Sequence, residues 1–175
     1  METEEKIKPD FRLPKESKWV APRAVADGGG GTLIATAILD VPAERIFRAL
    51  TSDEVERWWG APGFYRWTDW HADLQVCGQW SVIVRFTDGS TNGGSGEFIE
   101  IDAPKKIVMT RRLEKHPLLG SRETTITYRL DPTPHGTRIT VREEGFAGRG
   151  EAAYGNAEHW ERVLGWLDTY LSHSK

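Results

Sequence analysis

Residues 151–173 read EAAYGNAEHWERVLGWLDTYLSH. In this segment Trp160, Leu164, Leu167 and Leu171 follow one another at the spacing of a single buried helix face. Further apolar residues on an adjoining stripe widen that face to about half of the helix circumference. A face this wide needs a broad apolar surface to pack on, and the preceding sequence offers only short strands. We therefore expect one antiparallel sheet wrapped along a long C-terminal helix.

Composition limits the class of protein. The chain has 175 residues, which suits one domain with one core. Its net charge of −3, with both signs mixed, gives no reason to expect binding to nucleic acid or to an anionic membrane. The single cysteine, Cys77, excludes an internal disulfide and fits a reducing compartment. No apolar run approaches the roughly 20 residues that span a bilayer, and the charged start lacks a signal-peptide core, so we predict a cytoplasmic protein.

Residues 1–31 are predicted to form a flexible N-terminal extension, and residues 32–173 the folded domain. The extension contains three prolines and a run of four glycines from Gly28 to Gly31. Each glycine in such a run loses much backbone entropy on ordering, so the run is typical of a flexible joint. Phe11 and Trp19 leave open a hydrophobic contact with the domain or with a partner.

The order of elements predicts an α+β fold. Residues 32–39 are apolar and β-branched, as in a strand, and Pro42 opens the first of two short helices that end near Trp59. Turn signals then separate six further strands, over residues 67–75, 79–86, 96–101, 106–113, 123–130 and 137–144. This order gives a curved sheet of seven antiparallel strands around the long C-terminal helix, with two short helices after the first strand. One helix cannot fill the hollow of a strongly bent sheet, so we expect a cavity between them.

Several segments carry a family resemblance. They are VPAERIFRALTSDEVERWWGAP near the start of the domain, GEFIEIDAPKKIVMT in the middle, TRITV before Glu144, and HWERVLGWLDTYL at the end. Over about residues 32–173 the chain resembles the AHSA-type branch (activator of heat-shock chaperone ATPase homologue-like) of the START-like, helix-grip superfamily SRPBCC. The resemblance implies the helix-grip fold. It leaves function open, because the superfamily includes lipid and hormone binders, cyclases and chaperone co-factors. The chain departs from the pattern at Cys77 and His159, where the family often has glycine.

The role that we favour is binding of a hydrophobic small molecule, apolar or aromatic, in the cavity. Under this hypothesis the cavity wall is formed by Trp58, Trp59, Trp80, Met109, Tyr128, Val163 and Trp166. Tyr128 or Arg111 would orient the ligand. If Arg111 points inward, it needs a carboxylate from the protein or from an acidic ligand. The alternative, which we favour, is that Arg111 lies at a strand end or edge and its head group reaches water.

Other tryptophans and histidines are assigned by their positions. Trp67 and Trp70 are spaced by an odd number of residues, so in a regular strand they face opposite sides. At least one of the two is then expected outside the core or at an edge, where it could belong to an interface. His116 and His135 fall in turns and are interpreted as solvated loop residues.

Catalytic and metal motifs are absent from the sequence, so we predict no cofactor and no metal. It contains no HExxH motif and no paired Cys-x-x-Cys. Asp69, His71 and Asp73 alternate along one predicted strand, which a solvated strand face explains better than a metal cluster. The glycine-rich residues 88–96 are interpreted as a mobile hairpin tip that could act as a lid.

Two alternatives remain beside ligand binding. The first is an enzyme of cyclase or hydrolase type that uses the same cavity, with Arg111, Tyr128 and His71 as the residues to inspect. The second is a co-chaperone-like interaction module with an exposed apolar patch and little internal volume. A homodimer or a chaperone contact stays open under either.

Overall fold

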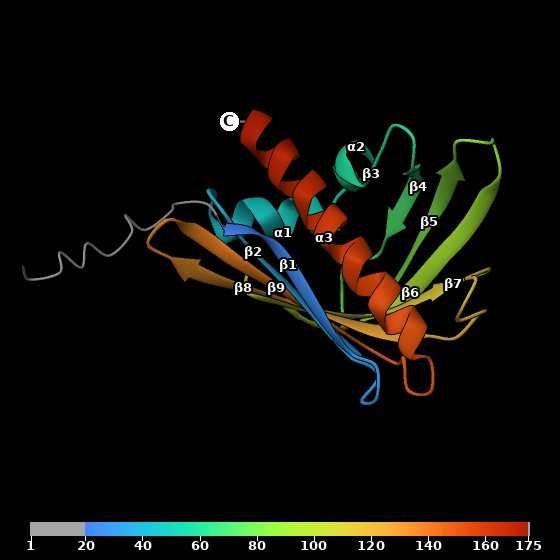
Figure 1. The fold of residues 1–175 in the computed structure, drawn as a ribbon. Coiled ribbons are helices and arrows are strands. Elements are labelled where there is room, and N and C mark those ends of the chain that lie inside the picture. Colours follow the sequence, from blue (N-terminus) through green and yellow to red (C-terminus); the bar gives the residue numbers. More distant parts are fainter. Residues whose placement is uncertain (1–19, 175) are drawn as a thin grey trace, which may run out of the picture.

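The computed structural model describes residues 20–174 and has an α+β fold (Figure 1). Nine strands form the sheet in this part of the chain: β1 (Val20–Asp27), β2 (Thr32–Leu39), β3 (Gly60–Ala61), β4 (Tyr65–Ala72), β5 (Gln79–Phe86), β6 (Thr91–Asp102), β7 (Lys106–Leu113), β8 (Thr124–Thr133) and β9 (Gly136–Glu144). The helices are α1 (Ala43–Thr51), α2 (Val55–Trp58) and α3 (Gly150–His173). None of the described helices has the length and apolar character needed to cross a membrane.

The sheet is antiparallel throughout and curved, and α3 crosses one of its faces (Figure 1). The strand order is β1-β2-β9-β8-β7-β6-β5-β4-β3. Helix α3 packs mainly on β1 and β2, where the backbone N–H of Ala24 donates to Glu161 Oε1 at 2.8 Å. Its predicted face is buried as expected, since Trp160, Leu164 and Leu167 are at most 1% exposed. The predicted wrapping of a sheet along this helix is confirmed.

The predicted seven strands are corrected to nine, and the two short helices follow the second strand of the chain. The additional long strand, β1, lies in the region expected to be an extension, and residues 1–19 lie outside the described residues. Pro22 is tolerated because β1 is an edge strand with a register shift between Val20 and Arg23. The glycine run that follows forms a tight turn, in which the Asp27 carboxylate accepts hydrogen bonds from the N–H groups of Gly29 and Gly30.

The glycine-rich residues 88–96 do not form a mobile lid, because most of them belong to strand β6. Gly94 and Gly96 pair with β5 and lie beside the indole ring of Trp80. A Cβ atom at Gly96 would collide with the Thr110 carbonyl and with Trp80. These glycines therefore make room for Trp80, whose Nε1 donates to the Thr110 carbonyl at 3.0 Å.

Trp67 and Trp70 are both buried and stack on each other, so the expectation that they face opposite sides is wrong. The pairing of β4 with β5 shifts register between Thr68 and His71, and Asp69 has a φ of 55°. One residue in this conformation interrupts the alternation of side chains between the two faces of the strand. Both indoles therefore turn to the same face, with their ring centroids 6.1 Å apart. In the described residues, no group of three or more His, Cys, Asp or Glu side chains is arranged to hold a metal.

Candidate functional site

An open cavity of about 360 Å³ lies between the first half of α3, strands β4 to β7 and the loop after β7. Its apolar wall includes Trp59, Trp67, Val84, Phe86, Leu113 and Leu118. Its polar lining consists of Tyr65, Asn92, Arg111, Lys115, His116, Asn156 and His159. The cavity thus joins an aromatic wall to a group of hydrogen-bonding side chains.

The aromatic wall is one end of a stack of indole rings. Trp59 and Trp67 lie nearly parallel, with ring centroids 3.9 Å apart. Behind them Trp70 and Trp80 continue the stack at 5.6 Å from each other. Because these rings pack on one another, the stack fills the hollow of the sheet at this side and leaves only the rings of Trp59 and Trp67 against the cavity.

Two of the eight predicted ligand-binding residues, Trp59 and Arg111, line this cavity. The other six pack elsewhere: Trp58, Trp80, Met109, Tyr128 and Val163 are buried in the core, and Trp166 is half-buried beside it. Trp58, for example, donates from Nε1 to the Ala49 carbonyl at 2.9 Å. Burial raises the pKa of Tyr128, whose ring packs edge-on against Trp160. Contact of these six with a ligand stays a prediction.

Arg111 points inward, so the favoured expectation that its head group reaches water is wrong. It is 7% exposed, and its Nη2 lies 2.6 Å from Oε1 of the fully buried Glu143. Glu143 also accepts hydrogen bonds from the Thr124 hydroxyl at 2.6 Å and from Trp160 Nε1 at 2.8 Å. The required carboxylate is therefore supplied by the protein, and its ion pair and two hydrogen bonds offset the cost of burying its charge.

Arg111 is further joined to α3 and to the loop after β7. Its Nη2 donates to Asn156 Oδ1 at 3.0 Å, and Asn156 Nδ2 donates to the Ala152 carbonyl at 2.8 Å. His116 Nε2 lies 3.5 Å from Asn156 Nδ2. We call Arg111, Asn156 and His116 the polar cluster, which occupies one end of the cavity.

His116 is half-buried in the cavity wall, so its interpretation as a solvated turn residue is corrected. Its Nδ1 accepts hydrogen bonds from the backbone N–H groups of Leu118 and Leu119 at 3.1 and 3.0 Å. These bonds fold the loop over the cavity and fix the ring. Burial, followed by the charge of Arg111, lowers the pKa of His116, so the imidazole is neutral near neutral pH.

Tyr65 and His159 form a second polar pair in the cavity wall. The Tyr65 hydroxyl accepts a hydrogen bond from Trp59 Nε1 at 3.2 Å and lies 2.7 Å from His159 Nε2. Its own hydrogen is then directed to His159. Burial, followed by the charges of Arg111 and Arg162, lowers the pKa of His159 to about 4. Burial also raises the pKa of Tyr65, so both groups are neutral near neutral pH.

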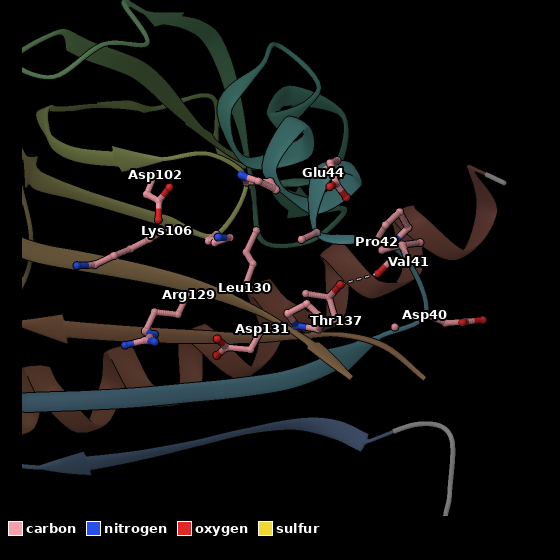
Figure 2. Close-up of a pocket in the computed structure, with 15 residues that line it drawn as sticks. Asp40, Val41, Pro42, Glu44, Asp102, Lys106, Arg129, Leu130, Asp131 and Thr137 are labelled. Carbon is pink, nitrogen blue, oxygen red and sulfur yellow. Dashed lines mark hydrogen bonds between the residues drawn. The ribbon is translucent and has the colours of Figure 1, made fainter. Parts of the chain in front are cut away.

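A larger groove of about 870 Å³ opens at the opposite end of the sheet, beside the start of α1 (Figure 2). Charged side chains of both signs, including Lys106, Arg129 and Asp131, lie along it. Its buried hydroxyl, on Thr137, already donates to the Val41 carbonyl at 2.8 Å. The groove has neither an aromatic wall nor a buried charged group, so the smaller cavity is the better candidate site.

Comparison with known proteins places the chain in a family. The family model of the Activator of Hsp90 ATPase homolog 1-like protein matches residues 40–172. A crystal structure of a protein from Rhodobacter sphaeroides is 22% identical, with a TM-score of 0.72 over 85% of this chain and 97% of that one. A solution structure of a protein from Arthrobacter aurescens is 22% identical, with a TM-score of 0.74 over 86% of this chain and 91% of that one.

DynU16, a protein of the dynemicin biosynthetic locus, is 17% identical, with a TM-score of 0.64 over 83% of this chain and 48% of that one. At these identities the solved structures show a common fold. No curated protein matches the sequence. The family model covers most of the domain and agrees with the predicted resemblance, so the chain belongs to the family of Activator of Hsp90 ATPase homolog 1-like proteins.

Proposed function

We propose that this domain binds an apolar small molecule with an aromatic portion in the cavity lined by Trp59 and Arg111. One observation carries the proposal: an open cavity remains between α3 and the sheet although tryptophan rings fill the hollow beside it. Its volume of about 360 Å³ lies at the lower end of the range of ligand sites, about 300–1,000 Å³. Burial of apolar ligand surface against Trp59, Trp67 and Phe86 would supply most of the affinity.

Helix α3 offers a matched pair of positions to test this proposal. Gly155 lines the cavity, and a Cβ atom there would meet nothing within 4 Å. Gly165 has the same open surroundings but does not line the cavity. We expect Gly155→Phe to fill the cavity and Gly165→Phe to leave it open, with similar effects on the helix.

The measurement is native mass spectrometry of protein purified from cells, combined with fluorescence titration by a panel of aromatic and lipid molecules. Wild type and Gly165→Phe are expected to bind a small molecule with equal affinity, and Gly155→Phe to lose at least about 90% of the binding, as expected for a blocked pocket. Binding by all three proteins alike, or by none of them across the panel, would reject the cavity as the site.

The cyclase- or hydrolase-type alternative has less support. Of the three residues it relied on, Arg111 lines the cavity, whereas Tyr128 is buried in the core and His71 is exposed on β4. His159, with a pKa of about 4, is a weak base near neutral pH. A cytoplasmic location, and contact with a second copy or a chaperone, stay predictions.

A further inference from the structure

The polar cluster holds hydrogen-bond donors that the protein does not use. Both contacts of Arg111, with Glu143 and Asn156, are made by Nη2. Among residues 20–174 we find no hydrogen bond from its Nε or Nη1. Neither atom is fully enclosed, because the one enclosed side-chain atom without a hydrogen bond in that range is Arg45 Nη1, which is ion-paired with Glu54. Arg111 lines the cavity and is 7% exposed, which puts its guanidinium within reach of a bound molecule.

His116 adds a donor at the same place. Because its Nδ1 accepts two backbone hydrogen bonds, the neutral ring carries its proton on Nε2. The neighbouring Asn156 Nδ2, 3.5 Å away, is also a donor and already binds the Ala152 carbonyl. Two donors cannot satisfy each other, so the Nε2–H of His116 is free to donate to an acceptor in the cavity.

The two charged side chains that line the cavity, Arg111 and Lys115, are both cations, and no carboxylate of residues 20–174 lines it. Glu143 is fully buried, does not line the cavity and is held by Thr124, Trp160 and Arg111. After burial itself, the Arg111 charge is the larger influence on the pKa of His116, and the opposing charge of Glu143 is the smaller. A negative group in the cavity would therefore be attracted to the polar cluster.

We propose that the ligand is an aromatic anion, with its ring against Trp59 and Trp67 and its acidic group on the free N–H groups of Arg111 and His116. An aromatic carboxylate is the natural class, because a carboxylate accepts several hydrogen bonds and pairs with a guanidinium. This inference rests on the proposed function and narrows it from apolar molecules in general to acidic ones.

The test uses two probes that differ by one group. 8-Anilinonaphthalene-1-sulfonate carries an anion on an aromatic body, and N-phenyl-1-naphthylamine is the same body without the sulfonate. Both become fluorescent in apolar sites, so their dissociation constants are measured by titration of wild type, Gly155→Phe and Gly165→Phe. In wild type we expect the anion to bind about tenfold or more tightly than the neutral probe, the effect of a charged hydrogen bond. Gly155→Phe should abolish binding of both probes.

Two variants locate the source of the preference. His116→Asn keeps an acceptor for the backbone N–H groups of Leu118 and Leu119 but removes the Nε2–H group. Arg111→Gln combined with Glu143→Gln removes both charges together and leaves no unpaired carboxylate. Each variant should reduce the preference for the anion. The affinity for the neutral probe should stay within about twofold of the wild-type value, because the contacts of the probe with Trp59 and Trp67 are unchanged.

The possible results separate the two proposals. Equal affinity for both probes, with binding still lost in Gly155→Phe, overturns the aromatic anion and keeps the cavity as an apolar site. An unchanged preference in His116→Asn and in the double variant also overturns it. If Gly155→Phe binds the probes like wild type, they bind elsewhere and both proposals fall.

Discussion

The buried ion pair of Arg111 with Glu143 holds the polar end of the cavity in place. The two side chains are 7% and 0% exposed. Arg111→Met would leave the carboxylate buried without its cation, so we expect the free energy of unfolding to fall by about 3–5 kcal/mol. The double variant Arg111→Met/Glu143→Gln removes both charges, and its free energy of unfolding should fall by about half as much as in Arg111→Met, or less. Urea denaturation near neutral pH measures both, and an equal loss in the single and double variants would contradict this role of the pair.

His159 makes stability depend on pH. Its pKa is lowered from 6.5 to about 4 in the folded protein, so the unfolded chain binds the proton more tightly. The folded state is then favoured at high pH, and this contribution is lost as pH falls from about 6.5 towards 4. Between about pH 7.5 and pH 5 the free energy of unfolding falls by about 2 kcal/mol because of His159. His116 adds a smaller decrease of the same sign.

His159→Gln provides the matched control. Glutamine can accept the hydrogen bond from Tyr65 and does not titrate. Urea denaturation at about pH 7.5 and about pH 5 should therefore show a smaller loss of stability in His159→Gln than in wild type, by about 2 kcal/mol. Equal losses in the two proteins would show that His159 is not buried in a neutral form.

The residues of the site differ in how well they can be predicted from the sequence. Glu143 alternates with Ile139 and Val141 along β9, so strand periodicity alone indicates that it points inward and needs the cation that Arg111 supplies. His116 and Asn156 carry no such signal. They meet because a loop folds back over the helix, and periodicity within either segment says nothing about that contact.

Among the secondary-structure elements, β4 contains the irregularity on which the indole stack depends. Asp69 has a φ of 55°, a conformation that asparagine and aspartate tolerate and β-branched residues do not. Asp69→Val should lower the free energy of unfolding by about 1–3 kcal/mol, whereas Asp69→Asn, which loses the same charge, should cost less than about 0.5 kcal/mol.

Thermal denaturation compares these two variants, and near-ultraviolet circular dichroism reports the packing of Trp67 and Trp70. Asp69→Val is expected to weaken the aromatic signal as well as stability. A valine variant as stable as the asparagine variant, with an unchanged spectrum, would mean that the irregularity in β4 does not orient these rings.

Elements with regular periodicity were predicted well. Strands β2, β5 and β7 have the predicted bounds, and α3 begins one residue earlier than expected, at Gly150. The missed strand, β1, contains Pro22 and small alanines and is held at the sheet edge by pairing with β2 and by packing under α3. Such a strand depends on its neighbours more than on its own sequence, which is why composition suggested an extension.

Across the domain, the sequence identifies the helix-grip architecture, and two of the eight predicted ligand-binding residues, Trp59 and Arg111, line the cavity. Side-chain alternation predicts which residues face inward, and most of the predicted wall residues do so. It does not predict how inward residues share the space. Tyr128, Val163 and Trp80 are buried in the core, and the cavity lies towards His116 and the first half of α3. The packing of large rings from distant segments determines which inward-facing residues are enclosed in the core and which line the cavity.

Tryptophan indole resonances test the central claim most directly. Trp59 and Trp67 line the cavity, whereas Trp58 and Trp80 are buried behind it. Protein labelled with ¹⁵N at its tryptophans would be titrated with N-phenyl-1-naphthylamine, and the indole N–H signals assigned with single Trp→Phe variants. We predict that the largest shifts belong to Trp59 and Trp67, and that Gly155→Phe abolishes them. Saturable binding that leaves these two signals unchanged and shifts those of other tryptophans would contradict ligand binding in this cavity.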